Sequence, residues 1–291
     1  MRGKVLVVHS DEISAEEFIE KNQAFVNAAK RNNIFLEFKS NEQIYSYIDN
    51  NIVKCHDTFG TFNYAFFFDK DVWLARNLEM MGVKVVNSSR AIDLCENKAN
   101  MYQELAKHNV NIPKTVIFPT LSEYTEKKAL HFINEAISDL GLPIVVKEWI
   151  GDAGRNVYLA KNRQELIDIV NRLKGRQILF QEFILEASGS DIRMFIIKNK
   201  VVAAIRRQGL SGDFRSNLSL GGTMYNYIPT YNDEKLAIEA AKAVGCDFAI
   251  VDILKSINGP VVCEVNTTAN VNNFSKTCDV DIPDLLLRTL K

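Results

Sequence analysis

The sequence of 291 residues has no hydrophobic run that approaches the about 20 apolar residues of a membrane-spanning helix. The first twelve residues, MRGKVLVVHSDE, contain too short an apolar stretch for the core of a secretory signal. An excess of charge is also missing, because 35 Lys and Arg stand against 36 Asp and Glu. This balance argues against a general binder of nucleic acid or anionic membranes. We therefore expect a cytoplasmic protein with neither kind of partner.

Cysteines are few and show no pairing in the sequence. There are five, without a C-x-x-C pair, at Cys55, Cys95, Cys246, Cys263 and Cys278. An odd, scattered set argues against a disulfide framework and against a zinc site. We expect reduced cysteines that serve in packing.

Two common nucleotide-binding signatures are absent. The stretch VVHSDE follows the first predicted strand, where a dinucleotide fingerprint would need glycines, and no Walker A motif occurs. The composition, with 47% hydrophobic and 24% charged residues, is nevertheless that of a folded globular protein. The length predicts two or three domains.

The first ninety residues alternate strand and helix patterns, which is typical of a small open α/β unit. Strands are predicted at KVLVV, IFLEF, YAFFF and VKVVN, with a helix over 14–33 that Ser14 caps and another near 72–81. One long helix is predicted over 91–108, and mixed strands and helices follow to 182. The last third reads as antiparallel strands, a helix over 233–245, an acidic hairpin and one closing helix. We expect domains at 1–90, 91–182 and 183–291.

The acidic hairpin lies in the stretch VDILKSINGPVVCEVNTTAN, with its turn predicted at 258–260. Strand alternation puts Glu264 and Asn266 on one face, and the antiparallel return brings Asp252 to about the same level. Carboxylate and carboxamide oxygens suit Mg²⁺ or Mn²⁺. Because magnesium held by few protein oxygens completes its shell with water and phosphate, the hairpin predicts a nucleotide polyphosphate. Taken alone, it also fits a surface hairpin with solvated acids.

The segment PIVVKEWIGDAGRNVYLA predicts a second part of a phosphate site. Its strand carries Lys147, and the following loop contains Gly151 and Gly154. Backbone N–H groups of such a loop can wrap phosphates beside the fixed charge of a lysine. A flexible hairpin loop explains the glycines equally well.

Two further segments fit a nucleotide. In QILFQEFILEASGSDIRMF, the strand end at 181–184 could offer backbone groups to an adenine, and Asp191 could accept from a ribose hydroxyl. The alternative is an ordinary domain crossover with a local Asp191–Arg193 pair. In GDFRSNLSLGG, Arg215 and Asn217 could hold phosphate or metal-bound oxygens, although alone this stretch would pass for a surface loop.

In this order the segments resemble the ATP-grasp superfamily, and within it the RimK-type alpha-L-glutamate ligases. The resemblance runs from about Asn87 to the C-terminus, and GDFRSN with DIR upstream and EVN downstream is its specific part. The first ninety residues match only in type, as the Rossmann-like pre-ATP-grasp domain of such enzymes. The implied fold is therefore an ATP-grasp fold of mixed α/β (α+β) class.

The resemblance implies that ATP and two Mg²⁺ (or Mn²⁺) ions bind between the central and C-terminal domains. Implied contacts to phosphates, adenine and ribose come from Lys98, Lys147, Gly151, Gly154, Glu182, Phe183, Asp191, Arg215, Ser216 and Asn217. Implied metal ligands are Asp252, Glu264 and Asn266. The loop 151–156 would act as a lid. Arg207, with Arg206 as the second choice, would stabilise an acyl phosphate.

The implied reaction is a carboxylate–amine ligation. The γ-phosphoryl group moves to a carboxylate, and an amine then displaces phosphate, which requires positioning and charge neutralisation rather than a protein nucleophile. The implied partners are an amino acid, L-glutamate in the family, and a carboxylate-bearing peptide, protein or small-molecule acceptor. A homo-oligomer, dimer or tetramer, is also implied.

Two positions depart from the family pattern. The lid has Asn156 where a further glycine is usual, and 267–270 reads TTAN where a small residue and Pro-Gly are common. The second departure leaves open a dipeptide or natural-product ligase. A nucleotide-binding regulator without turnover is the third alternative, and the full set of metal ligands argues against it.

Overall fold

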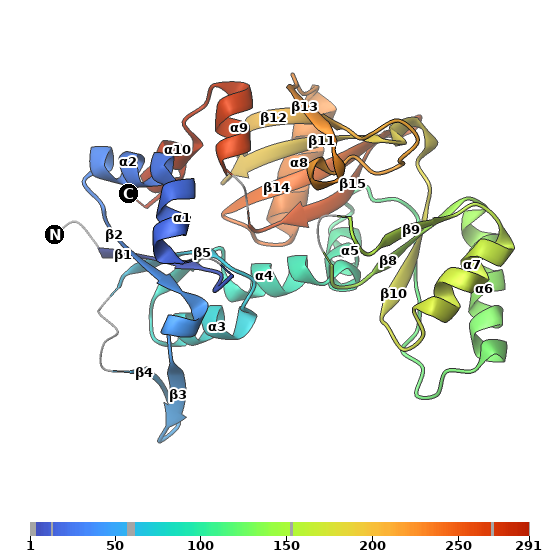
Figure 1. Cartoon of the computed structure of the whole chain (residues 1–291), viewed down its shortest axis with the longest axis horizontal. Coiled ribbons are helices and arrows are strands. Elements are labelled where there is room, and N and C mark those ends of the chain that lie inside the picture. The colour runs from blue at the N-terminus through green and yellow to red at the C-terminus, as the bar shows by residue number, and fades with distance from the viewer. Residues whose placement is uncertain (1–3, 13, 57–61, 152–153, 269–270, 291) are drawn as a thin grey trace.

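The structure, a computed structural model, describes residues 4–12, 14–56, 62–151, 154–268 and 271–290. Figure 1 shows the N-terminal elements at one end of an elongated molecule and the elements from β7 to β10 at the other. The last antiparallel sheet lies between them. The described residues form four sheets, whose strand orders are β2-β1-β5-β6, β7-β10-β8-β9, β13-β12-β11-β14-β15 and β3-β4.

The N-terminal sheet is parallel and buried on both faces. Its strands are β1 (Lys4–His9), β2 (Phe35–Ser40), β5 (Tyr64–Phe68) and β6 (Lys84–Val86). Alternate residues of β1 enter different cores: Val5 and Val7 pack in one, Leu6 and Val8 in the other. This explains the unbroken apolar stretch of β1, because a parallel sheet is covered on both sides.

The helices of this unit are shorter than the sequence predicted. The range 14–33 holds two helices, α1 (Ala15–Lys21) and α2 (Gln23–Asn32), separated at Asn22. The Ser14 cap is confirmed, since its side chain accepts from the Glu17 N–H at 3.2 Å. Helix α3 (Val72–Met80) occupies the predicted place.

A small hairpin was missed by the sequence reading. It follows a 3₁₀ turn, η1 (Asn41–Gln43), and consists of β3 (Ser46–Asp49) and β4 (Ile52–Cys55), which project from the N-terminal unit (Figure 1). Ile48 and Ile52 are exposed, so its pattern does not show the alternation of a half-buried strand.

The predicted single helix over 91–108 is wrong. The chain forms α4 (Ser89–Glu96) and α5 (Lys98–Lys107), and Asn97 between them is extended. Its Oδ1 accepts from the N–H groups of Ala99 and Asn100 at 3.0 and 3.2 Å, which caps α5. The break places Lys98 at the first position of a new helix.

The central elements form an antiparallel sheet with two helices packed on it. They are β7 (Thr115–Ile117), α6 (Glu126–Leu140), β8 (Ile144–Glu148), β9 (Val157–Ala160), α7 (Arg163–Arg172) and β10 (Ile178–Glu182). Ile133 of α6 and Val170 of α7 share a core with Val146 of β8.

The last sheet is antiparallel, as predicted. Its strands are β11 (Ser190–Ile197), β12 (Lys200–Gln208), β13 (Thr223–Asn226), β14 (Phe248–Ser256) and β15 (Gly259–Asn266). Between them lie η2 (Leu185–Ala187), η3 (Leu218–Leu220) and α8 (Tyr231–Ala243). The predicted turn at 258–260 is wrong in register, because Gly259 and Pro260 already pair with Ser256 and Lys255.

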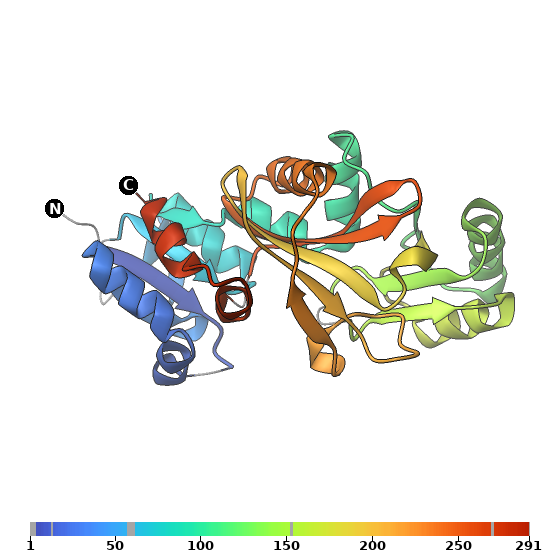
Figure 2. The same ribbon diagram turned by 90° about the horizontal axis from the view of Figure 1, so that it is seen from above.

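The chain ends in two helices where one was predicted, α9 (Val271–Cys278) and α10 (Ile282–Arg288). Figure 2 shows α10 returning to the N-terminal unit. There Asn32 of α2 donates to Asp284 at 2.7 Å, and Arg31 pairs with Asp281. One hydrophobic core consequently joins residues of the N-terminal unit, the last sheet and both closing helices.

No helix in the described ranges is long and apolar enough to span a membrane. All five cysteines are free thiols. Four of them lie away from the cleft described below, whereas Cys263 lines it.

A buried carboxylate anchors α8 to the last sheet. Asp233 is fully buried, and its carboxylate accepts from Lys255 Nζ at 2.6 Å, Tyr227 OH at 3.0 Å and the Thr230 N–H at 3.0 Å. Burial alone would raise the pKa of Asp233, but Lys255, Thr230 and Tyr227 lower it below its ordinary value.

Replacing Asp233 with asparagine is expected to lower the free energy of unfolding by about 2–4 kcal/mol at pH 7, because a charged partner of Lys255 and of the helix cap is lost. The depressed pKa makes this stabilisation complete above the unfolded-state pKa of about 3.9, and it is lost as the pH falls through the folded-state value. Urea unfolding at pH 7 and pH 3 measures the difference. The exposed Glu239→Gln on the same helix is the control, and a difference that grows on acidification would contradict the assignment.

Candidate active site

A cleft lies between the central sheet and the last sheet, and it collects most of the residues singled out in the sequence. Thirteen of the fourteen predicted site residues line it: Lys98, Lys147, Gly151, Gly154, Glu182, Phe183, Asp191, Arg207, Arg215, Ser216, Asn217, Asp252 and Glu264. Asn266 is not among the lining residues. The lid prediction is only partly covered, because 152–153 lie outside the described residues.

The acidic hairpin has the predicted alignment. Asp252 on β14 faces Glu264 on β15 directly, and Ile250 faces Asn266 one step further along. A register shift follows between Asp252 and Ile253: Ile253 pairs with Val262, which leaves Cys263 of β15 as the extra residue of a bulge. The two carboxylates therefore meet at one level of the sheet.

Two arginines face the Asp252 carboxylate. Arg193 donates to it through Nε at 2.7 Å and Nη2 at 2.6 Å, and Arg207 through Nη2 at 3.0 Å. Burial would raise the pKa of Asp252, but both guanidinium groups lower it below its usual value. The predicted alternative of a local Asp191–Arg193 pair is wrong, because neighbouring strands offer Arg193 and Asp191 other partners.

Asp191 is paired with Arg207 and with Ser216, which lies in the loop 212–222. Arg207 Nε donates to Asp191 at 2.8 Å and Nη2 at 2.5 Å, while Ser216 Oγ donates to the same carboxylate at 2.6 Å. Burial disfavours the charge of Arg207, yet Asp252 and Asp191 raise its pKa above the ordinary value. Arg207 thus bridges two buried carboxylates, and it remains a cation.

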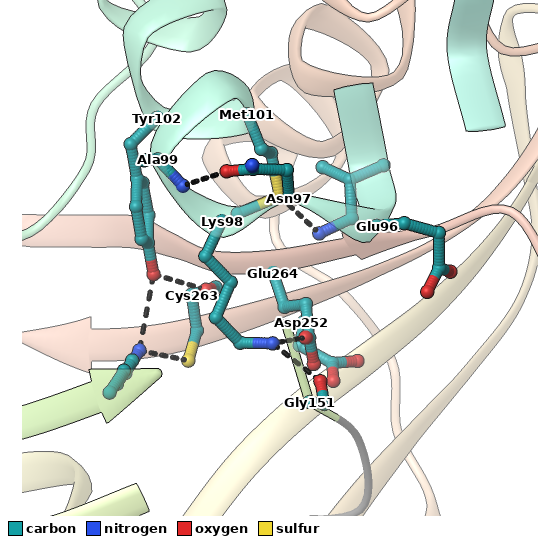
Figure 3. Close-up of polar contacts among 12 residues, drawn as sticks. Glu96, Asn97, Lys98, Ala99, Met101, Tyr102, Gly151, Asp252, Cys263 and Glu264 are labelled. Atoms are coloured by element: carbon teal, nitrogen blue, oxygen red, sulfur yellow. Dashed lines mark hydrogen bonds and ion pairs between the residues drawn. The ribbon is translucent and has the colours of Figure 1, made fainter. Parts of the chain in front are cut away.

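Lys98 reaches the cleft from the first turn of α5. Figure 3 shows its side chain extending between Glu264 and Gly151. Nζ lies 3.0 Å from the Glu264 carboxylate and donates to the Gly151 carbonyl at 2.7 Å. The α4–α5 break at Asn97 makes this possible, because it turns the start of α5 toward the hairpin.

Lys147 is buried on β8 beside Tyr102 and Cys263. Its Nζ lies 3.1 Å from Tyr102 OH and 3.6 Å from Cys263 Sγ. Tyr102 OH donates to the Cys263 carbonyl at 2.5 Å (Figure 3). Burial opposes the charge of Lys147, but Cys263, Tyr102 and Glu264 raise its pKa above the ordinary value. Lys147 therefore supplies the cleft with a cation on the central sheet, opposite Arg207 on the last sheet.

Both Gly151 and Gly154 are closely approached by other side chains. Gly154 has φ of +73°, and a Cβ there would lie 2.5 Å from Asn217 Oδ1. Arg215 Nη1 donates to the Gly154 carbonyl at 3.0 Å, while its pKa is raised by Asp213. A Cβ at Gly151 would lie 2.8 Å from Asn156 Nδ2. Asn156, which departs from the family pattern, thus occupies the space beside Gly151 that a side chain at position 151 would need.

The predicted hinge lies at the end of β10. Glu182 Oε1 accepts from the Lys114 N–H at 2.7 Å, and the Phe183 ring stands at 71° to the Phe214 ring with centroids 6.3 Å apart. These contacts join this strand end to Lys114, just before β7, and to Phe214 in the loop 212–222.

Three residues near the cleft were missed as functional candidates: Tyr102, Arg193 and Cys263. Tyr102 lies four residues after Lys98, on the same side of α5, and Arg193 lies two residues after Asp191, on the same face of β11. These spacings were available in the sequence. The contact between Gln181 and Tyr102 joins distant segments, and no local pattern signals it.

The donor set fits a divalent cation that brings its own further ligands. No group of three or more His, Cys, Asp or Glu side chains that could hold a metal occurs among the described residues. Asp252 and Glu264 supply two carboxylates, and Asn266 Nδ2 is a buried polar atom without a partner in the described part of the chain. Because a carboxamide can rotate to present its oxygen at this position, the set matches the hard ligands that Mg²⁺ takes with phosphate oxygens.

Comparison with known proteins agrees with this geometry. The family model "RimK-like ATP-grasp domain" matches residues 95–290. A protein named probable alpha-L-glutamate ligase from Maridesulfovibrio salexigens is 40% identical over 218 residues, 74% of this chain and 69% of its own. One of the same name from Trichodesmium erythraeum is 36% identical over 221 residues, covering 75% and 71%.

Solved structures show the same fold at low sequence identity. A RimK domain ATP-grasp protein from Sphaerobacter thermophilus matches with a TM-score of 0.69 at 18% identity, over 97% of both chains. D-alanine–D-alanine ligase from Bacillus anthracis complexed with ATP matches with 0.71 at 16%, over 98% and 95%. The predicted ATP-grasp fold is confirmed. The chain belongs to the RimK-like ATP-grasp family.

Proposed function

We propose that this chain is an ATP-dependent carboxylate–amine ligase that adds L-glutamate to the carboxylate of a peptide, protein or small-molecule acceptor. The observation that carries the proposal is the cleft in which Asp252 and Glu264 meet Lys98, Lys147, Arg207 and Arg215. Relatives of up to 40% identity named as probable glutamate ligases support the choice of glutamate.

In this proposal ATP lies in the cleft with its phosphates toward the hairpin. Lys98, Arg215, Ser216 and Asn217 surround the phosphates, and the hinge at Glu182 and Phe183 borders the adenine. Gly151 and Gly154 let the loop approach the phosphates closely. Asp191 remains a proposal for the ribose, although its carboxylate is held by Arg207 and Ser216.

Asp252, Glu264 and Asn266 would hold two Mg²⁺ ions. Bound magnesium neutralises the phosphate charge and aligns the γ-phosphoryl group. Arg207, fixed between Asp191 and Asp252, lies where it can stabilise the charge that develops on the phosphoryl group and on the acyl phosphate. In this proposal, exclusion of water from the cleft would protect that intermediate from hydrolysis.

The region after β15 supports a second candidate function, that of a dipeptide ligase. Thr267, which departs from the family pattern, is 1% exposed, and its Oγ1 has no partner in the described part of the chain. Its hydroxyl is therefore a free hydrogen-bond donor and acceptor directly after β15. A different amine or carboxylate could be selected there, as in a dipeptide ligase.

Incubation with Mg·ATP and hydroxylamine across a panel of amino acids, glutamate-terminated peptides and carboxylate coenzymes tests the proposal. A hydroxamate on a peptide or coenzyme carboxylate, with ADP formed in equal amount, is the expected result. A hydroxamate only on a free amino acid would favour the dipeptide ligase. ATP binding without any hydroxamate would contradict ligation of these substrates.

A further inference from the structure

Arg193 has a special place relative to the cleft. Strand pairing puts Arg193, Asp252 and Glu264 in one row across β11, β14 and β15. Asp191 lies two residues before Arg193, about 7 Å along β11, and pairs with Arg207 in the row that enters the nucleotide cleft. Arg207 lines the cleft, whereas Arg193 is not among its lining residues. Asp252 therefore separates an arginine on the nucleotide side from an arginine on the other side.

The next row away from the nucleotide contains Phe195, Ile250 and Asn266. Phe195 and Ile250 belong to the core shared with the N-terminal unit. Arg193 thus lies at the boundary between the Asp252 and Glu264 carboxylates and the N-terminal unit. The buried Asn266 Nδ2, which has no partner among the described residues, lies on the same side.

The Arg193 guanidinium uses only one of its two bidentate edges. Nε donates to Asp252 Oδ1 at 2.7 Å and Nη2 to Oδ2 at 2.6 Å. Among the described residues no hydrogen bond to Nη1 is formed, so the edge made by Nη1 and the second Nη2 hydrogen is open. The side chain is 23% exposed, so Arg193 is not enclosed in the core.

A ligase must bring a substrate carboxylate close to Asp252 and Glu264, and like charges at this distance repel. Arg207 already holds two carboxylates, and Lys98 is divided between Glu264 and Gly151. An open arginine edge is the donor arrangement that binds a carboxylate in bidentate fashion.

We propose that Arg193 binds a substrate carboxylate through its Nη1/Nη2 edge while its Nε/Nη2 edge keeps Asp252 in place. The inference rests on the proposed ligase function and names the anchor of its anionic substrate. The bound carboxylate belongs either to the acceptor or to the amino acid that is added, and the experiment distinguishes the two sources.

The test compares wild type, Arg193→Gln and Arg193→Lys, with Arg206→Gln as the matched control. Arg206 is the exposed arginine on β12 that donates to Ser190 Oγ and does not line the cleft. Three quantities are measured: the affinity for Mg·ADP by calorimetry, the KM values for L-glutamate and a glutamyl-glutamate dipeptide, and the affinity of glutarate for the Mg·ADP complex.

We expect Arg193→Gln to raise the KM of one carboxylate substrate roughly 10- to 100-fold, because hydrogen bonds between charged groups are lost. Glutarate affinity should fall in parallel. Mg·ADP affinity should change less than about threefold, since Arg207 still faces Asp252. Arg193→Lys keeps the charge but cannot span two carboxylates, so an intermediate loss is expected. If only the KM for the dipeptide rises, Arg193 binds the carboxylate of the acceptor. If only the KM for glutamate rises, Arg193 binds a carboxylate of the added amino acid.

Weaker Mg·ADP binding with unchanged KM values would overturn the inference, because Arg193 would then serve only to hold Asp252. Unchanged values throughout would overturn it as well. Failure of the proposed function looks different: wild type would form no product from any probe. In that case glutarate binding alone tests the role of Arg193. Loss of glutarate binding in Arg193→Gln supports the role of Arg193 as the carboxylate anchor. Glutarate binding that is unchanged in Arg193→Gln, or no glutarate binding in wild type, contradicts that role.

Discussion

Replacing Glu264 with glutamine is expected to reduce ligation roughly 10³-fold or more, which corresponds to about 4 kcal/mol of transition-state stabilisation. The carboxylate faces Asp252 across the hairpin and lies 3.0 Å from Lys98 Nζ. An amide of the same shape keeps an oxygen but removes the negative charge that Glu264 would contribute to holding a divalent cation. Steady-state ADP release at increasing Mg²⁺ and Mn²⁺ concentrations measures the loss.

The fold should tolerate this change, because the Glu264 side chain is 25% exposed and its one ion pair among the described residues is with Lys98. A shift in unfolding free energy of at most about 1 kcal/mol is expected, as for other partly exposed pairs. Glu135→Gln on the exposed face of α6 is the control. A ligation rate equal to that of wild type would remove Glu264 from the metal site.

Replacing Arg207 with lysine is expected to slow the chemical step on the order of 10²–10³-fold, with a much smaller loss of ATP affinity. Arg207 donates to Asp191 and Asp252 together, and a single ammonium cannot reproduce that geometry. Lysine is preferred to an uncharged residue, because the buried Asp191 carboxylate would otherwise lose its cation, which would destabilise the fold by about 3–5 kcal/mol.

Single-turnover phosphoryl transfer and equilibrium ATP binding separate the two effects for Arg207→Lys. Arg206→Lys, on the exposed side of β12, should leave both near wild type. Equal losses in rate and in ATP affinity would mean that Arg207 contributes to nucleotide binding alone.

Local patterns predicted the hairpin, because strand alternation is fixed by backbone geometry. Asp252 and Glu264 face each other as the alternation requires, and the antiparallel last sheet is also as predicted. Gly154 was also singled out from the sequence, and its φ of +73° is a backbone conformation that L side chains rarely adopt. These features depend on neighbours in sequence or on a single strand pairing.

Features that depend on tertiary contacts were not predictable in this way. The helix break at Asn97 interrupts a pattern that reads as one amphipathic helix, and capping of α5 together with the contacts of Lys98 stabilises it. The local Asp191–Arg193 pair that the sequence allowed as an alternative is not formed, because Asp191 pairs with Arg207 and Arg193 with Asp252. Residues two apart on a strand look like a local pair, but strands β12 and β14 provide nearer opposite charges.

The central claim is that the γ-phosphoryl group of ATP is transferred to a substrate carboxylate. Ligation with an acceptor whose carboxylate carries ¹⁸O tests it most directly, because an acyl phosphate leaves one carboxylate oxygen on the phosphate that the amine displaces. We expect one ¹⁸O atom in inorganic phosphate for each amide formed, with ADP as the other product. Amide formation with unlabelled phosphate, or with the label in AMP, would contradict the account.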